Sequence, residues 1–170
     1  GRGSRAGVGT GTLQWNQSEA IAATDVYFGR GYSTGNLVVP TGGEFYLGTE
    51  AAPTRTLSIA YNDASNGTAT ADLDFSQTNP TFTAFIADDL SIGRETGAAN
   101  SASTAADGRL TLASNSTLHL GTADALATLN IGWSQNGNYY GAGNATGVLD
   151  VLDSAAVLDL HLSELNVGRG

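Results

Sequence analysis

The sequence predicts an all-β protein folded as a parallel β-helix (β-solenoid), with about five three-sided coils and uncapped ends. Apolar residues alternate with polar ones in short bursts, which is the period of half-buried strands. The bursts recur along the chain and are separated by segments rich in Gly, Ala, Ser, Thr and Asn, which favour turns. No stretch has the period of an amphipathic helix. We therefore expect residues 1–170 to form a single β-solenoid unit, one segment of a longer array or polymer.

Each expected coil begins at a leucine and contains three short strands. The leucines are Leu13, Leu37, Leu73, Leu110 and Leu149. The expected strands lie around 13–15, 21 and 26–28; then 37–39, 45–47 and 57–59; then 73–75, 82–86 and 90–92; then 110–112, 118–120 and 129–131; and finally 149–151, 157–162 and 165–167. Three strands per coil predict a triangular cross-section, and the variable segments 62–71, 96–108 and 134–147 are expected to be loops at its corners.

A second pattern groups the coils in pairs. The first, third and fifth coils end in an apolar-Gly-Arg motif at residues 28–31, 92–95 and 167–170, whereas the second and fourth carry Tyr/His-Leu-Gly-Thr at 46–49 and 119–122. Residues 1–13 also continue naturally from 165–170. Matching, uncapped ends predict that copies stack head to tail, because an open strand edge pairs readily and such a contact does not close into a ring.

The repeat L-x-V/I-G-R followed by G-x-L-x-V and L-x-L motifs covers residues 129–160 and 165–170, with echoes at 90–120. It resembles the β-solenoid repeats of bacterial autotransporter passenger domains and PEP-CTERM-type surface proteins. The resemblance implies a secreted, elongated protein at the cell surface or outside the cell, and it carries over no catalytic residues. The coil lengths and the glycosylation motifs depart from that pattern.

Composition excludes several classes of function. The net charge is −9, with seven arginines and no lysine, so nucleic acid is not an expected partner. No segment is long and apolar enough to insert into a membrane. There is no cysteine, so disulfides and thiolate metal sites are excluded. We expect no cofactor.

Four N-x-S/T motifs are candidate N-glycosylation sites, and they begin at Asn16, Asn66, Asn115 and Asn144. Asn66 and Asn144 fall in the loops before Leu73 and Leu149, where a glycan would point outward. The alternative is that all four are ordinary turn residues.

Arg30, Arg94 and Arg169 each follow a glycine that ends a strand, so they are expected at one repeated corner. We predict a structural role, in which each arginine bonds turn carbonyls or pairs with a carboxylate of a neighbouring coil. The alternative is a row of guanidinium groups that binds an acidic sugar. Tyr27 and Tyr46 are predicted to form an outward-facing stacked pair that could bind a glycan.

Acidic residues and histidines do not form a recognisable catalytic or metal motif. Most of the aspartates alternate with core positions and should be solvated; they are Asp72, Asp74, Asp88, Asp89, Asp150, Asp153 and Asp159. His119 and His161 are expected on the surface in non-adjacent coils, without a third metal ligand. No nucleophile-elbow motif is present, and we expect the protein not to be an enzyme.

The sequence thus favours a non-enzymatic structural subunit of an extracellular fibre that self-assembles head to tail and carries N-glycans in its loops. An adhesin segment that binds a polysaccharide or a receptor is the alternative. A polysaccharide lyase or hydrolase is a third hypothesis, which the absence of lysine makes weak.

Overall fold

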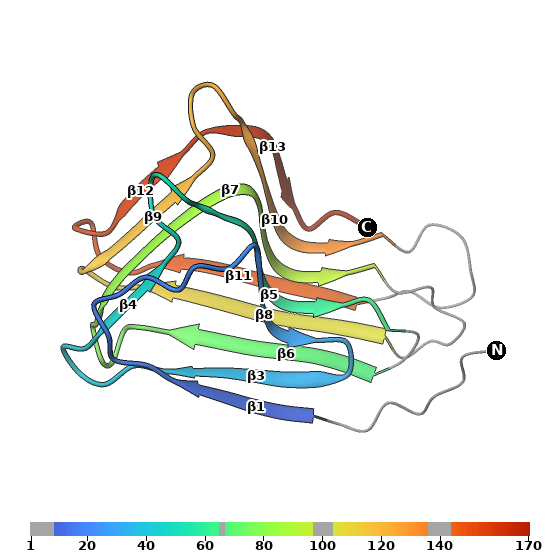
Figure 1. The fold of residues 1–170 in the computed structure, drawn as a ribbon. Helices are drawn as coiled ribbons and strands as arrows, with labels where there is room; N and C mark the ends of the chain where they lie inside the picture. The colour runs from blue at the N-terminus through green and yellow to red at the C-terminus, as the bar shows by residue number, and fades with distance from the viewer. Residues whose placement is uncertain (1–8, 65–66, 97–103, 136–143) are drawn as a thin grey trace.

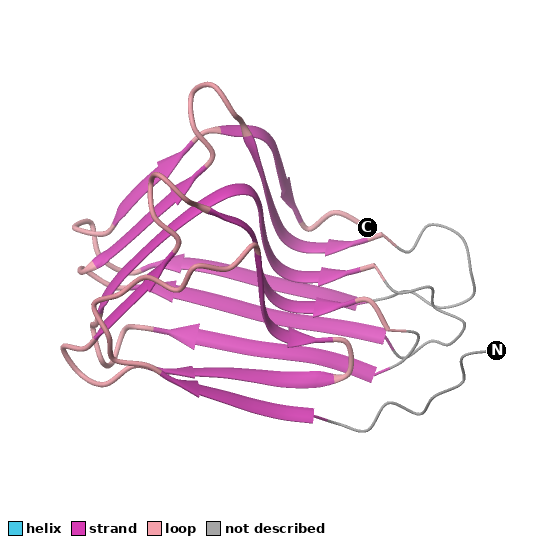
Figure 2. Cartoon of the chain, viewed as in Figure 1, coloured by secondary structure: helices cyan, strands magenta, loops and turns pink. Residues whose placement is uncertain are grey.

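The computed structural model describes residues 9–64, 67–96, 104–135 and 144–170. In these ranges the chain forms strands and loops only, and every strand pairing is parallel (Figures 1 and 2). None of the described residues belongs to a helix that is long and apolar enough to cross a membrane. The parallel strands stack as a β-solenoid, which confirms the predicted fold class.

The first sheet has five strands in the order β1-β3-β6-β8-β11. Its strands are β1 (Gly9–Gln14), β3 (Ser33–Val38), β6 (Gly67–Asp74), β8 (Thr104–Leu112) and β11 (Asn144–Val151). Leu13 lies beside Leu37, and Leu73, Leu110 and Leu149 lie in one register, so the leucines expected to begin the coils are aligned.

The second sheet has eight strands. They are β2 (Asp25–Arg30), β4 (Glu44–Leu47), β5 (Thr54–Asn62), β7 (Thr81–Glu95), β9 (Ser116–Leu120), β10 (Ala127–Ser134), β12 (Val157–Leu160) and β13 (Leu162–Val167). The long strand β7 organises this sheet: its first part pairs with β4 and β9, and its second part pairs with β5 and β10. Figure 1 shows the strands beside β7 bending together with it.

About three turns lie between neighbouring turns, namely β3-β4-β5, β6-β7 and β8-β9-β10, although β4 pairs with β7 on one side and has only an isolated bridge from Ile21 to Leu47 on the other. Strands β1 and β2 lie at one end of the stack, and β11, β12 and β13 lie at the other. The count of five coils and the three-sided cross-section remain predictions.

The core consists of columns of equivalent apolar residues, one from each turn. Leu57, Leu90 and Leu129 form one such column and are buried. A neighbouring column contains Ile59, Ile92 and Ile131. Phe82 stacks on Phe45 and Phe75 at ring centroid distances of 6.0 and 4.7 Å. Because every turn adds a residue to the same columns, each turn is stabilised chiefly by the turns beside it.

Glycines let the two sheets approach closely where β5, β7 and β10 bend. Gly93 and Gly132 have φ values of 65° and 62°, which L-residues adopt only at a cost. They face Gly108 and Gly147 of the first sheet, and a Cβ atom on either of those two would overlap with the backbone of the second sheet. Gly93 and Gly132 belong to a column of equivalent positions on successive strands, the glycine column, which consists of Gly29, Ala60, Gly93, Gly132 and Gly168. Ala60 has φ 59° despite its side chain.

The paired-coil pattern corresponds to a difference at one corner. After Leu47 and after Leu120 the chain makes a loop that begins with a glycine of positive φ. The backbones of Thr49 and Ala52 exchange hydrogen bonds of 3.1 and 3.1 Å, and Thr122 and Ala125 exchange bonds of 2.8 and 3.2 Å. Strand β7 passes the same corner without a loop. The Tyr/His-Leu-Gly-Thr motif therefore specifies a projecting loop on alternate turns.

Candidate functional site

A column of alternating cations and aromatic rings lies on the outer face of the second sheet. We call it the outer ladder, and it consists of Arg30, Tyr61, Arg94, Trp133 and Arg169. The guanidinium carbon of Arg94 lies 4.2 Å from the Trp133 ring centroid and 5.8 Å from that of Tyr61. Arg30 and Arg169 lie 6.0 Å from the rings of Tyr61 and Trp133. Each of these distances suits a cation–π interaction.

Two further columns run beside the outer ladder. One contains Asp25, Thr56, Asp89, Thr128 and Glu164, and the other contains Tyr27, Ser58, Ser91, Asn130 and Asn166. The strands therefore alternate between two kinds. A charged strand carries a carboxylate and an arginine (β2, β7 and β13), and an aromatic strand carries a threonine and a ring (β5 and β10). Alternation keeps like charges two strands apart, at about 9.6 Å instead of about 4.8 Å.

The arginines of the outer ladder are also paired with carboxylates. Arg30 and Arg169 lie 2.7 Å from Asp63 and from Glu164 respectively, and Arg94 lies 3.4 Å from Asp89. The hydrogen bond to Asp63 raises the pKa of Arg30 above its ordinary value. Asp63 belongs to the neighbouring turn, as predicted for a structural arginine, whereas Asp89 and Glu164 belong to the same turns as Arg94 and Arg169.

Among the three carboxylates that pair with arginines of the outer ladder, Asp89 is the most buried. Burial raises the pKa of Asp89, against the opposing effects of the Ser91 hydroxyl, Arg94 and the Asn130 amide. The amide of Asn130 donates to Asp89 at 2.9 Å, and the amide of Asn166 donates to Asn130 at 2.8 Å. Asp89, Asn130 and Asn166 therefore form a chain of hydrogen bonds across β7, β10 and β13.

The outer ladder leaves little room for sugar stacking. Trp133 lies between Arg94 and Arg169, and Tyr61 lies between Arg30 and Arg94, so guanidinium groups cover the ring faces. The rings therefore contact arginines of neighbouring turns and link successive turns together.

The predicted pairing of Tyr27 with Tyr46 is wrong. Tyr27 lies on β2, with its ring 5.8 Å from Tyr61 and 4.6 Å from the guanidinium of Arg30. Tyr46 lies on β4, beside Thr83 of β7. Strand β4 pairs with the first part of β7, whereas β2 pairs with β5, which lies beside the second part of β7. The two tyrosines therefore belong to different parts of the second sheet.

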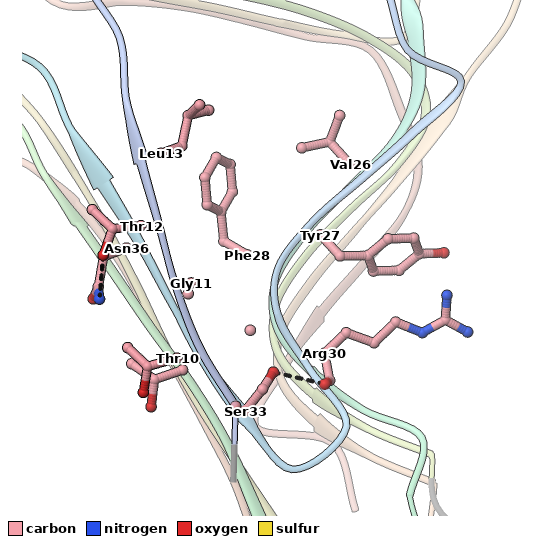
Figure 3. Close-up of a pocket in the computed structure, with 14 residues that line it drawn as sticks. Thr10, Gly11, Thr12, Leu13, Val26, Tyr27, Phe28, Arg30, Ser33 and Asn36 are labelled. Carbon is pink, nitrogen blue, oxygen red and sulfur yellow. Dashed lines mark hydrogen bonds between the residues drawn. The ribbon is translucent and has the colours of Figure 1, made fainter. Parts of the chain in front are cut away.

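In the part of the chain that the structure describes, one end of the solenoid is open at its core. A cavity of about 600 Å³ lies between β1 and β2. Figure 3 shows Leu13, Val26 and Phe28 between the two strands, whereas Tyr27 and Arg30 point away on the other side of β2. Among the described residues, β1 pairs only with β3 and β2 only with β5, so each strand has a free edge.

The opposite end exposes core residues. Leu165 is 58% exposed although it continues the buried column of Leu129 and Leu90. Val167 is 67% exposed although it continues the column of Ile131 and Ile92. Val148 and Val157 are exposed on the outer faces, beside Arg109 and Thr117, whereas Val151 is 41% exposed and continues the column of the buried Leu112. This surface has the composition of a core layer that lacks its next turn.

The histidines share one carboxylate, contrary to their expected separation. Strand β12 lies beside β9, so His119 and Asp159 are direct neighbours, and Asp159 lies 3.1 Å from His119 and 3.2 Å from His161. The His119 ring stacks on Phe85 with centroids 4.4 Å apart. The expectation of non-adjacent coils was wrong because β9 and β12 belong to consecutive turns.

This cluster borders a cavity of about 410 Å³ between the two projecting corner loops, with Glu50 on its far side. Among the residues described, no group of three or more histidines, aspartates and glutamates is arranged to hold a metal ion. Two imidazoles bound to one carboxylate fix each other's orientation at a partly exposed corner, and the cluster links β9 to β12.

The candidate glycosylation sites lie in different surroundings. Asn144 is exposed at the start of β11. Asn115 is exposed in the turn between β8 and β9, and its side chain donates a hydrogen bond of 3.4 Å to the carbonyl of Asn79. Asn16 is exposed and accepts a bond of 3.3 Å from the Glu44 amide. Asn66 lies outside the described residues. Glycosylation of all four remains a prediction.

The comparisons with known proteins find no counterpart. No protein-family model, no curated protein and no solved structure matches the chain. The class of protein therefore rests on its own geometry, which is that of a parallel β-solenoid with an outer cation–π ladder. Among the described strands, those at both ends of the stack have free edges.

Proposed function

We propose that this protein is a non-enzymatic structural subunit of an extracellular β-solenoid fibre, in which units stack end to end through strand edges. In this proposal the chain contributes five coils with three sides, and the long strand β7 spans two of those sides. N-glycans would decorate the exposed loop asparagines.

The observation that carries the proposal is the continuation of buried core columns onto a free surface. Leu165 and Val167 are the most exposed members of columns whose other residues are buried or partly buried, and among the described strands theirs pairs with β10 alone. Burying an apolar side chain of this size contributes roughly 1.5–3 kcal/mol. A further parallel strand laid on β13 would bury both side chains and satisfy the free backbone groups of that edge.

The other end offers the matching surface. Val26 and Phe28 on β2 occupy the positions that Leu165 and Val167 occupy on β13. A strand equivalent to β2 would therefore continue both core columns in the same register.

Electron microscopy of the purified protein, together with sedimentation velocity over a range of concentrations, tests the proposal. We expect thin unbranched filaments or concentration-dependent rods with an axial repeat of about 4.8 Å. Replacing both Leu165 and Val167 by Asp should abolish association while the fold persists. Leu126→Asp is the matched control, because Leu126 is 55% exposed but lies in a corner loop. Discrete particles of one chain at every concentration would contradict the proposal.

A further inference from the structure

The alternation of charged and aromatic strands defines the chemistry of the strand that the open ends accept. Along the order β2-β5-β7-β10-β13 the outer ladder carries Arg, Tyr, Arg, Trp and Arg. Both terminal strands, β2 and β13, are therefore of the charged kind. We propose that each open end is complementary to an aromatic strand, with a threonine, a small polar residue and an aromatic ring at the three outer positions.

Arg94 is the internal example of a completed contact. It has an aromatic ring on each side, from Tyr61 of the preceding turn and Trp133 of the following turn. Arg169 contacts the ring of Trp133 on one side only, since β13 pairs with β10 alone among the described strands. At the other end, Arg30 contacts Tyr61 at 6.0 Å and also Tyr27 of its own strand at 4.6 Å. An aromatic strand would supply the missing ring at Arg169 and would add a ring from the neighbouring turn at Arg30.

The joint between two identical copies lacks this complementarity. Stacking β2 of one copy on β13 of another would bring Arg30 beside Arg169, and Asp25 beside Glu164, at about 4.8 Å. Like charges directly opposite each other on neighbouring strands are destabilising. The core columns of the two copies would match, but their outer ladders would not. Copies therefore join weakly, and a coil with an aromatic strand is the preferred neighbour. This inference rests on the proposed end-to-end stacking and specifies its partner.

A pair of substitutions on the full chain tests the inference without changing the net charge. Asp25→Thr with Arg30→Tyr gives β2 the threonine and the ring of an aromatic strand, with Tyr27 unchanged between them. The matched control is Asp25→Asn with Arg30→Gln, which removes the same two charges but adds no ring. Both sets remove the exposed ion pairs of Asp25 with Arg55 and of Arg30 with Asp63, which are worth at most about 1 kcal/mol each. Circular dichroism and thermal unfolding establish that each variant is folded.

Sedimentation equilibrium gives the dissociation constant of the copy-to-copy joint for each protein. We expect the Thr/Tyr variant to associate at least tenfold more tightly than both the wild type and the Asn/Gln control. Adding Leu165→Asp to the Thr/Tyr variant should remove the gain, which would assign it to the joint between β13 and β2. We expect salt to strengthen wild-type association, because salt screens like-charge repulsion.

The opposite end provides an independent version of the test. Glu164→Thr with Arg169→Tyr should tighten association as the β2 substitutions do, with Glu164→Gln and Arg169→Gln as its control. Equal dissociation constants for wild type, ring variants and controls would overturn the complementarity while leaving end-to-end stacking intact. Absence of association in every protein would instead overturn the proposed stacking.

Discussion

The guanidinium of Arg94 lies 4.2 Å from the centre of the Trp133 ring on the next turn of the solenoid. The same guanidinium faces Tyr61 on the preceding turn, at 5.8 Å. One side chain therefore ties three successive turns together on the outer surface, where the apolar core contributes nothing. This contact explains why arginine recurs on alternate turns and suggests several measurements.

Removing the central cation should destabilise the protein. Arg94→Gln eliminates two cation–π contacts, each worth about 0.5–1 kcal/mol at a partly exposed site, and leaves Asp89 without its ion pair. We expect a loss of about 1–3 kcal/mol in the free energy of unfolding. Urea titration measures this loss, and Trp133 fluorescence in a Trp15→Phe background should also change. Arg109→Gln is the control: it breaks the exposed pair with Asp150, so it should cost less than about 1 kcal/mol. Equal costs would mean that the rings contribute nothing.

Replacing glycine by alanine should cost much more stability at Gly93 than at Gly168 of the same column. Gly93 and Gly168 have nearly the same φ, 65° and 63°. A Cβ on Gly93 would overlap with the carbonyl of Thr146, whereas a Cβ on Gly168 meets nothing within 4 Å. Gly168→Ala should therefore cost only the backbone term, about 1–2 kcal/mol, and Gly93→Ala should cost more than about 3 kcal/mol or prevent folding. Thermal unfolding compares the two. Similar melting temperatures would show that the sheets do not approach closely at Gly93.

Ala60 should be easy to replace by glycine. It is fully buried, but its φ of 59° is a conformation that glycine adopts without strain. Replacing Ala60 by glycine relieves about 1 kcal/mol of backbone strain. This gain should offset the loss of a buried methyl group, which costs about 0.8 kcal/mol. We expect Ala60→Gly to change the stability by less than about 1 kcal/mol. Ala69→Gly, at an equally buried position of β6, should be clearly destabilising. Chemical denaturation would contradict this prediction if Ala60→Gly were the worse of the two.

Stability should depend on pH through Asp89. Burial raises the pKa of Asp89 above its ordinary value of 3.8, so the folded protein holds this proton more tightly than the unfolded chain does. The protonated carboxyl therefore stabilises the folded protein. This stabilisation is complete when the pH is below the pKa of Asp89 in the unfolded chain, and it is lost as the pH rises through the higher pKa of the folded protein. The stability of the wild type relative to Asp89→Asn should therefore decline as the pH rises from 3 toward 6.

Asp89→Thr provides a second comparison for the same pH series, because it copies Thr56 and Thr128 of the adjacent strands. It removes the same titrating group, so the wild type should lose stability relative to it over the same interval. A difference between wild type and either variant that grew with pH would contradict the direction of the shift.

Several features of the fold could be predicted from the sequence because they repeat. Leu13, Leu37, Leu73, Leu110 and Leu149 mark equivalent positions of the first sheet, and the alternate Leu-Gly-Thr motifs mark the projecting loops. A solenoid reuses one pattern of core residues and turns, so local sequence carries most of its architecture.

The composition of the outer ladder was missed, although a signal was present. The segments ending at Tyr61 and Trp133 align with those ending at Arg30, Arg94 and Arg169 once the last residue is allowed to vary. The Gly-Arg motif marks only the charged turns, so it does not indicate the aromatic turns between the arginines. The shared contacts of Asp159 with His119 and His161 depend on the register of β12 against β9, which the repeat motifs do not reveal.

Strand period and repeat motifs are local properties, so they are sufficient to predict a parallel β-solenoid with alternating turns. The tertiary structure was needed to show which side chains of neighbouring turns meet, since register depends on loop lengths and on the bends at Gly93 and its equivalents. It decided in particular that the arginines contact rings, that Tyr27 and Tyr46 lie apart, and that both terminal strands of the ladder are charged.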